Sequence, residues 1–296
     1  MTARPDPTPV ILPAAEWRAR LADHAASVRS FTRPYAARRA ANRPHPVHDF
    51  LFTYYHFSMR KLEAWHPGAH IGLADDGAPC PWQTNRFYHL RDGVWQLDLT
   101  AIDAGLARRL GWIATLLRAT AGRQPNFACH GLHEWAMVFR AEDVRHAGSV
   151  PLRLPQADID ALVASRPLLC THFDAFRFFA PTAQPLNRHA LSLDARPDLE
   201  QPGCLHANMD LYKWAYKSMP WIGSDILMDA FHLALALREL DMRASPYDLS
   251  AFGYPPIPIE TADGRRDYES LQRSLAERAA PLRARLIKAL ERTLRG

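Results

Sequence analysis

Most of the chain has the residue pattern of amphipathic helices. Apolar positions recur every three or four residues, a spacing that places them on one face of a helix, and Ala, Leu and Arg fill much of the rest. The predicted helices cover 14–43, 102–121, 156–165, 204–218, 224–242 and 266–294. Asp103 is placed to cap the start of the helix over 102–121, and Gly122 is placed to end it. Ser224 is placed to cap the start of the helix over 224–242.

Two stretches depart from this helical pattern. The first runs from Pro46 to His66 and is apolar on most sides, so we expect one buried helix that begins near the proline. The second covers residues 86–99, where apolar and polar residues alternate on both sides of Asp92-Gly93. This pattern predicts a β-hairpin, because Asp-Gly favours the tight turn that joins two antiparallel strands.

Two other segments have no single predicted secondary structure, and a third is predicted to be a connection. Residues 127–140 and 168–179 are rich in apolar and aromatic side chains and suit a helix as well as a strand. Residues 180–203 contain Pro, Asn and Asp at short intervals, which indicates a long connection.

Together these elements predict a mainly α fold. We expect a single domain over residues 1–296, a helical bundle-like structure with the hairpin as its small β element, because no composition shift or repeat divides the chain. Residues 1–13 suggest a loose N-terminal arm, and 266–294 a C-terminal amphipathic helix. The arm lacks the apolar centre of a signal peptide and no run of about 18 apolar residues is present, so we expect a cytoplasmic protein without a membrane partner.

The charge is unevenly distributed along the chain. The formal net charge is +5, but residues 1–44 and 264–296 each carry +5, which leaves −5 for residues 45–263. A groove that follows nucleic-acid phosphates needs an excess of basic residues, so the acidic centre disfavours DNA as a partner. It suits a small-molecule substrate or a cation better.

Four segments place a histidine close to an acidic residue. In the stretch 201–217, which begins with a Pro-Gly turn, His206 and Asp210 lie four residues apart and share one face of the predicted helix. The other three segments are His45-Pro-Val-His48-Asp49, His130-Gly-Leu-His133-Glu134 and His172-Phe-Asp174. In a helix, each H-x-x-H-acid motif would present one contiguous face. We expect the four segments to converge.

Such a convergence favours a metal site, because buried charges are costly unless they are paired or bound to a metal. Two histidines with one carboxylate are typical of non-haem iron, and two such sets would form a dinuclear centre. The expected metal ligands are His133, Glu134, His172, Asp174, His206 and Asp210, with His45 and Asp49 as additional ones. Structural His–Asp pairs without a metal are the alternative.

The residues beside these expected ligands have two possible roles. His48 and His130 suit either ligands or neighbours of ligands. Cys129, Cys170 and Cys204 each lie within two residues of a histidine. This position favours small buried residues packed beside a site over zinc ligation, because no C-x-x-C pair is present.

Aromatic and basic residues in the same segments suggest a substrate pocket, with ordinary core packing as the alternative. Aromatic side chains would hold a planar ring, and basic ones a carboxylate or phosphate. The expected substrate-binding residues are Trp135, Arg177, Tyr212, Trp214 and Lys217. The chain has no P-loop, G-x-G-x-x-G, G-x-S-x-G or H-E-x-x-H motif, so we expect no nucleotide cofactor and none of the common hydrolase activities.

Five sequence blocks together resemble one bacterial family. They are HPVHDFLFTYYHFSMRKLEAWHPG, HGLHEWAMVFR, THFDAFRFF, QPGCLHANMDLYKWAYK and LDMRASPYDL, and they span most of the chain. The family is usually labelled 3-methyladenine DNA glycosylase. The resemblance implies excision of an alkylated base that is flipped into an aromatic pocket, with Asp174, Asp210 or Glu134 as the acid. The chain lacks the L-P-G-[VI]-G loop with which helix-hairpin-helix glycosylases bind phosphates.

The residues themselves favour a different function. A buried His/carboxylate site between aromatic walls predicts a metal-dependent enzyme, a mono- or dinuclear non-haem iron oxidoreductase that acts on a small ring-containing molecule. Zinc and manganese are the other candidate metals. Glu134, Asp174 and Asp210 are the expected catalytic residues. A metal-independent DNA glycosylase and a non-enzymatic ligand-binding protein are the alternatives.

Overall fold

The computed structural model describes residues 10–141 and 150–295 and confirms the mainly α fold. Its strands are β1 (Val10–Leu12), β2 (Ile71–Ala74), β3 (Tyr88–Arg91) and β4 (Val94–Leu97). Its helices are α1 (Ala14–Ala40), α2 (Phe50–Tyr54), α3 (Met59–Glu63), α4 (Ala104–Ala121), α5 (Leu132–Met137), α6 (Gln156–Ala164), α7 (Phe173–Phe176), α8 (Arg196–Leu199), α9 (Leu205–Lys217), α10 (Ser224–Arg243) and α11 (Ala262–Arg295).

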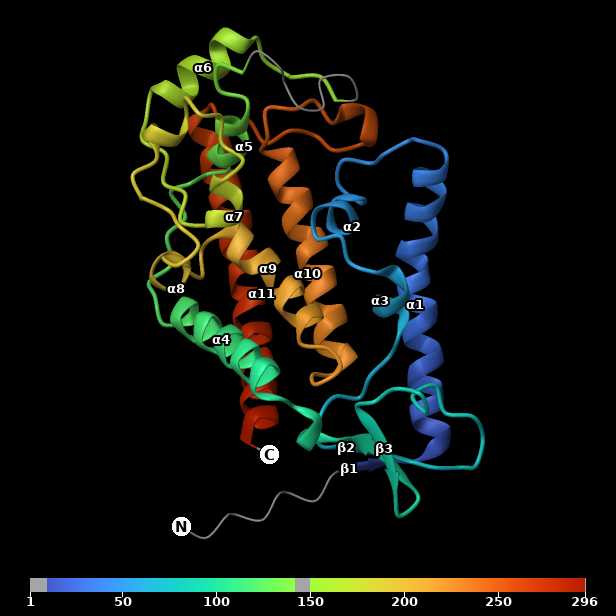
Figure 1. Ribbon diagram of the computed structural model, residues 1–296. Helices are drawn as coiled ribbons and strands as arrows, with labels where there is room; N and C mark the ends of the chain where they lie inside the picture. The colour runs from blue at the N-terminus through green and yellow to red at the C-terminus, as the bar shows by residue number, and fades with distance from the viewer. Residues whose placement is uncertain (1–9, 142–149, 296) are drawn as a thin grey trace.

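Helices α9, α10 and α11 lie side by side at the centre of the molecule (Figure 1). Helix α9 packs along α10, and α11 packs against both of them and against α4. Helix α1 lies on the other side of α10, where it contacts α3, and the strands form a small sheet at one end (Figure 1). Helix α9 is therefore enclosed by other elements on most of its sides, whereas α11 buries one face and exposes the other.

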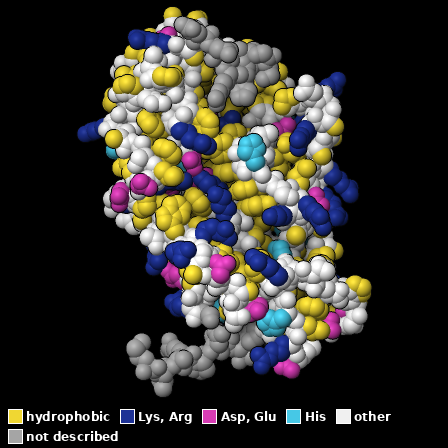
Figure 2. All heavy atoms as spheres, in the orientation of Figure 1, with side chains coloured by type: hydrophobic (Ala, Val, Ile, Leu, Met, Phe, Trp, Pro, Cys, Tyr) yellow, Lys and Arg dark blue, Asp and Glu magenta, His cyan; other side chains and the backbone are white. Residues whose placement is uncertain are grey.

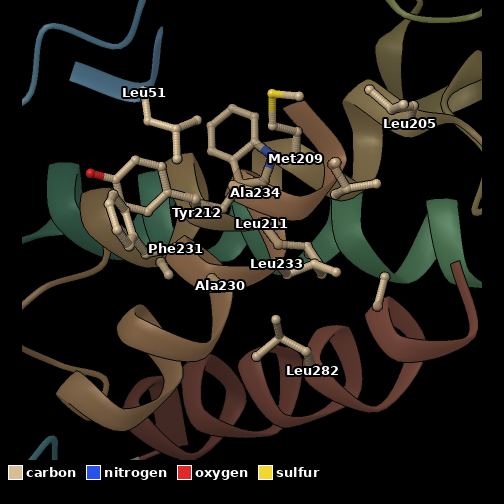
Figure 3. Packing of buried hydrophobic residues seen from close by; sticks show 14 of the residues in the cluster. Leu51, Leu205, Met209, Leu211, Tyr212, Ala230, Phe231, Leu233, Ala234 and Leu282 are labelled. Carbon is tan, nitrogen blue, oxygen red and sulfur yellow. The ribbon is translucent and has the colours of Figure 1, made fainter. Parts of the chain in front are cut away.

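Apolar side chains fill the space between the central helices. Met209 and Tyr212 of α9, Phe231 of α10 and Leu282 of α11 are almost completely buried, and they point into the same core (Figure 3). The rings of Tyr212 and Phe231 meet edge to face with their centroids 5.3 Å apart. Each such side chain contributes about 1.5–3 kcal/mol through burial, so this packing fixes how α9 and α10 face each other.

The predicted helices are confirmed with small shifts at their ends. Asp103 caps α4, since its Oδ1 accepts a hydrogen bond from the Leu106 N–H at 2.8 Å. The predicted cap Ser224 is wrong, because Gly223 holds the cap position and the Ser224 Oγ accepts a hydrogen bond from the His66 N–H instead. Helix α11 begins at Ala262, before the predicted start at 266.

The single helix predicted from Pro46 to His66 is wrong. This stretch forms two short helices, α2 and α3, because the backbone turns at His56, whose φ is +51°. The turn brings the rings of Tyr55 and Phe57 against Tyr212 of α9, with centroids 5.6 and 5.4 Å apart. Packing of aromatic side chains on α9 thus overrides the helical pattern.

The sheet contains the predicted hairpin and two strands that the sequence analysis missed. The strand order is β1-β2-β4-β3, with β1 parallel to β2 and the other pairs antiparallel. Asp92 and Gly93 have φ values of +50° and +74°, which the two-residue turn between β3 and β4 requires. Strand β1 corrects part of the predicted loose arm, since Val10 pairs with Ile71; residues 1–9 lie outside the described residues.

Residues 127–140 and 168–179, which suited a helix as well as a strand, each form one short helix within a longer irregular stretch. Helix α5 starts only after His130 and Gly131, which have φ values of +46° and +75°. The spacing of His130 and His133 predicted one shared helical face. This prediction is wrong, because His130 lies before the helix begins. Helix α7 follows His172, whose Nδ1 accepts a hydrogen bond from the Ala175 N–H. Of the helices described, none combines the length and the apolar character needed to cross a membrane.

The half-buried histidine His66 gives the fold a predictable pH dependence. Burial lowers its pKa to about 4, and its Nδ1 lies 2.9 Å from the Tyr88 hydroxyl. Between pH 4 and about 6.5 the unfolded chain binds the proton and the folded chain does not, so the free energy of unfolding should fall as the pH falls through this window.

We expect the drop in stability from pH 7 to pH 5 to be about 2 kcal/mol smaller in His66→Gln than in the wild type. Urea unfolding at the two pH values measures it. His189→Gln, at another half-buried histidine, is the matched control. Equal drops in all three proteins would contradict the prediction.

Candidate metal centre

A buried polar network surrounds α9 at the centre of the fold. His206 and Asp210 lie one turn apart on this helix, with only 7% and 1% of their surfaces exposed. His206 faces His133 of α5 and Asp241 of α10, whereas Asp210 faces residues from the segments around α7 and α8. The network therefore has two halves, which we call the His206 half and the Asp210 half.

The His206 half consists of His133, His206 and Asp241. The His133 Nε2 lies 2.6 Å from the Asp241 Oδ1, and the His206 Nε2 lies 4.0 Å from the Asp241 Oδ2. The two imidazole rings meet edge to face with centroids 4.6 Å apart. One ligand atom from each side chain lies within 4.8 Å of the other two, so the three residues could hold a metal ion.

Glu134 and Arg238 adjoin this group, and Arg238 contacts both Glu134 and Asp241. The Nη1 of Arg238 donates hydrogen bonds to the Glu134 Oε1 and to the Asp241 Oδ2, both at 2.9 Å. Burial, together with the nearby charge of Asp241, raises the pKa of Glu134 to about 7. Glu134 thus contacts the arginine that orients Asp241 and is not one of the three clustered ligands.

The two histidines of this half differ in charge. Burial, together with the charge of His133, lowers the pKa of His206 to about 3. Burial alone would also lower the pKa of His133, but Asp241 and Cys129 raise it well above its usual value. Burial would raise the pKa of Asp241, but the charge and hydrogen bond of His133 hold it far below its usual value. His206 is therefore neutral, while His133 and Asp241 form an ion pair.

A small cavity of about 10 Å³ adjoins His133 and His206. A cavity of this size holds about one water molecule. Its walls include Tyr268 and Gln272, and the Tyr268 hydroxyl and the Gln272 Oε1 are buried with no hydrogen-bond partner among the residues that the structure describes. Buried polar atoms are nearly always paired, so this cavity has the chemistry of a site for a polar occupant.

The Asp210 half consists of His172, Asp174 and Asp210, which form the second group that could hold a metal ion. The His172 Nε2 lies 3.3 Å from the Asp210 Oδ2. The Lys213 Nζ donates to the Asp174 Oδ2 at 2.5 Å and to the Asp210 Oδ2 at 3.0 Å. The Arg196 Nη2 donates to the same Asp210 oxygen at 3.1 Å.

Cationic side chains already compensate the carboxylates of the Asp210 half. Burial would raise the pKa of Asp210, but Lys213, His172 and Arg196 hold it well below its usual value. Its other oxygen accepts a hydrogen bond from the Tyr55 hydroxyl at 2.8 Å. A metal ion bound here would lie beside an ammonium and a guanidinium group, and like charges at such distances repel strongly. The His206 half has one contacting arginine, Arg238, where the Asp210 half has a lysine and an arginine, and metal binding there would release the proton of the His133–Asp241 pair. The His206 half therefore suits a metal better.

The two halves meet at His172. Its ring lies stacked on the ring of His206, with centroids 5.6 Å apart. The His172 Nε2 also lies 3.7 Å from the Glu200 Oε1, which accepts a hydrogen bond from the Arg196 Nε at 2.7 Å. The two halves are therefore in direct contact through His172.

The fold brings together most of the ligands expected from the sequence. The residues found in the network are His133, Glu134, His172, Asp174, His206 and Asp210. Among the residues described, His45 and Asp49 belong to neither of the two groups that could hold a metal ion. Asp49 instead accepts hydrogen bonds from the Arg38 side chain and the His45 N–H. The half-buried His45 meets the ring of Phe252 edge to face, away from both groups.

The two undecided histidines lie outside the network. His48 contacts the ring of His45, and its Nε2 is 3.2 Å from the Tyr254 hydroxyl. His130 pairs with Glu269 of α11 at 3.4 Å. Neither histidine belongs to the two groups that could hold a metal ion.

The expected substrate-binding residues occupy different environments. Trp135 is fully buried and its indole N–H donates to the Ala244 carbonyl at 2.8 Å, and Tyr212 is a core residue. The ring of Trp214 lies beneath the Lys217 ammonium, 5.6 Å from its centroid. Arg177 is half exposed and pairs with Asp174 at the surface end of the Asp210 half. The structure thus does not place these five residues around one cavity.

Five charged members of the network were not among the residues expected from the sequence. They are Arg196, Glu200, Lys213, Arg238 and Asp241. Arg238 and Asp241 lie three residues apart in α10, a helix whose other residues in this region are mostly buried and apolar. A close pair of opposite charges inside such a helix is a signal of buried polar contacts. Arg196 and Glu200 lie in the segment read as a connection and gave no such signal.

Comparisons with known proteins do not identify a relative. No family model matches the chain, and neither a curated protein nor a solved structure matches it.

The buried carboxylate Asp210 should make a large contribution to stability. Asp210→Asn removes the negative charge that compensates Lys213, Arg196 and His172, and breaking a buried ion pair typically costs about 3–5 kcal/mol. Urea unfolding measures this loss. The matched control is Asp229→Asn, which removes the exposed partner of Arg285 and should have a far smaller effect. Similar small losses for both variants would show that the Asp210 half is not an energetically important ion-pair network.

Proposed function

We propose that His133, His206 and Asp241 bind one transition-metal ion, and that the protein is a metal-dependent enzyme of the mononuclear non-haem iron type. The observation that carries this proposal is the clustering of two imidazoles and one carboxylate, with ligand atoms within 4.8 Å of one another, in a buried position. Two histidines and one carboxylate with open positions are typical of iron(II) sites. Zinc and manganese are the other metals that this donor set accepts.

The surroundings of the group support a bound ion. The adjoining cavity contributes room for one water-sized ligand, and the unpartnered Tyr268 hydroxyl and Gln272 Oε1 could hydrogen-bond to it. Arg238 holds one oxygen of Asp241, and such contacts behind a ligand fix its orientation. When bound, iron supplies one-electron redox and Lewis-acid chemistry.

The protein itself contributes positioning and exclusion of water. The ring of His172 packs on His206, and Glu134 fixes Arg238 behind Asp241. The cavity admits only a water-sized ligand. Oxidation of a small ring-containing molecule at this site therefore requires the cavity wall to open, and the exposed Asn126 is where that wall reaches the surface.

Metal analysis of protein purified without a His-tag tests the proposal. We expect about one equivalent of iron, zinc or manganese per chain, or one equivalent of bound Co²⁺ on titration of the metal-free protein. His206→Ala and Asp241→Asn should each weaken Co²⁺ binding at least about tenfold, because each removes one of three ligands. His189→Gln is the matched control, since it removes a half-buried histidine that belongs to neither of the two groups that could hold a metal ion.

Thermal unfolding of the variants establishes that they remain folded. Less than about a tenth of an equivalent of any transition metal, with no Co²⁺ binding at pH 7, would overturn the proposal. In that case release of free base from alkylated DNA is the assay for the alternative, a metal-independent glycosylase with Asp174 or Asp210 as its acid. Failure of both assays would leave a non-enzymatic ligand-binding protein.

A further inference from the structure

A second and much larger hollow lies away from the candidate metal centre. It has a volume of about 1100 Å³ and is bordered by α1, α3, the segment before β3, α4 and the end of α9. It shares no lining residue with the small cavity beside His133. Pockets for small molecules commonly measure about 300–1,000 Å³, so this groove is large enough for a drug-sized or nucleotide-sized ligand.

Basic side chains dominate the charge of the groove. Five line it, and Arg29 is compensated by Glu63, the one acidic lining residue, at 3.2 Å. The other four are Arg60, Lys61, Arg109 and Lys217. Within residues 10–141 and 150–295, none of these four takes part in an ion pair. Figure 2 shows Lys and Arg side chains gathering over this part of the surface, around α3.

The basic residues come from three segments that are distant in the sequence. Arg60 and Lys61 lie in α3, Arg109 in α4, and Lys217 at the end of α9. Chain folding therefore builds a cationic surface inside the region whose net charge is −5. Unpaired like charges repel one another, so their convergence on one groove favours an anionic ligand.

Aromatic side chains form the other part of the lining. Phe57 and Tyr216 stack face to face with their centroids 3.8 Å apart, and Trp65, Trp82 and Phe87 also line the groove. Flat apolar walls with a few charged groups are typical of sites for small organic ligands. Lys217 also lies over the ring of Trp214 on α9.

We propose that this groove binds a small organic anion, a molecule with an aromatic body and a carboxylate, sulfonate or phosphate group. The aromatic body packs on the Phe57–Tyr216 side, and the acidic group lies among Arg60, Lys61 and Arg109. The site is separate from the proposed metal centre and does not depend on it. A single-stranded nucleic acid is the competing occupant, because it also presents rings and phosphates.

The probe for this test is 8-anilinonaphthalene-1-sulfonate, with N-phenyl-1-naphthylamine as its uncharged counterpart. We expect the sulfonate to bind the full chain with a stoichiometry of one and at least about tenfold more tightly than the uncharged probe. The triple variant Arg60→Gln/Lys61→Gln/Arg109→Gln should weaken sulfonate binding about tenfold, a change of about 1.4 kcal/mol. Its effect on the uncharged probe should be less than about twofold, since the aromatic walls are unchanged.

Two further variants locate the site. Arg278→Gln removes an exposed positive charge of α11 that does not line the groove and should change neither affinity. Ala25→Trp places a large side chain in the groove and should abolish binding of both probes. Circular dichroism and thermal unfolding establish that each variant is folded, and the titrations are repeated with and without added metal to separate this result from that of the metal centre.

Three outcomes would overturn the proposal. The first is equal affinity for the two probes in the wild type. The second is unchanged sulfonate binding in both the triple variant and Ala25→Trp. The third is displacement of the sulfonate by a twelve-residue oligothymidylate at lower concentration than by AMP or benzoate, which would assign the groove to single-stranded nucleic acid.

Discussion

Asp210 and Asp241 are ionised carboxylates with at most 1% of their surfaces exposed, and a buried charge is tolerated only where partners compensate it. The partners come from α5, the segments around α7 and α8, α9 and α10. Compensation of two charges therefore fixes how five pieces of the chain meet. The apolar core of α9, α10 and α11 supplies the free energy of burial, but it is less directional than these hydrogen bonds.

The two halves of the network reach electrical balance in different ways. In the Asp210 half, Lys213 and Arg196 both donate to one oxygen of Asp210 and the Tyr55 hydroxyl donates to the other, so the half is complete without a further cation. In the His206 half, a neutral imidazole faces an Asp–His pair and a cavity with unpartnered polar atoms. This difference is the reason for placing the proposed metal ion in one half only, and for assigning a structural role to the other.

Helix α9 connects the candidate metal centre with the cationic groove. His206 lies near its start, Asp210 one turn later, and Tyr216 and Lys217 at its end line the groove. The Tyr55 hydroxyl bonds Asp210, and its ring stacks on Phe57, which stacks on Tyr216. A direct chain of contacts thus leads from the groove to the Asp210 half.

The sequence by itself determined the helices with strong periodicity, the Asp92-Gly93 hairpin, and the segments that meet around His206 and Asp210, because local spacing and turn chemistry act within a few residues. Only the tertiary structure decided that Asp241 completes the group with His133 and His206, that His45 and Asp49 lie apart, and that basic residues converge in an acidic region. Those outcomes depend on which distant side chains face each other. Such facing is set by packing around α9 and by the turn at His56, and no pattern along the chain records it.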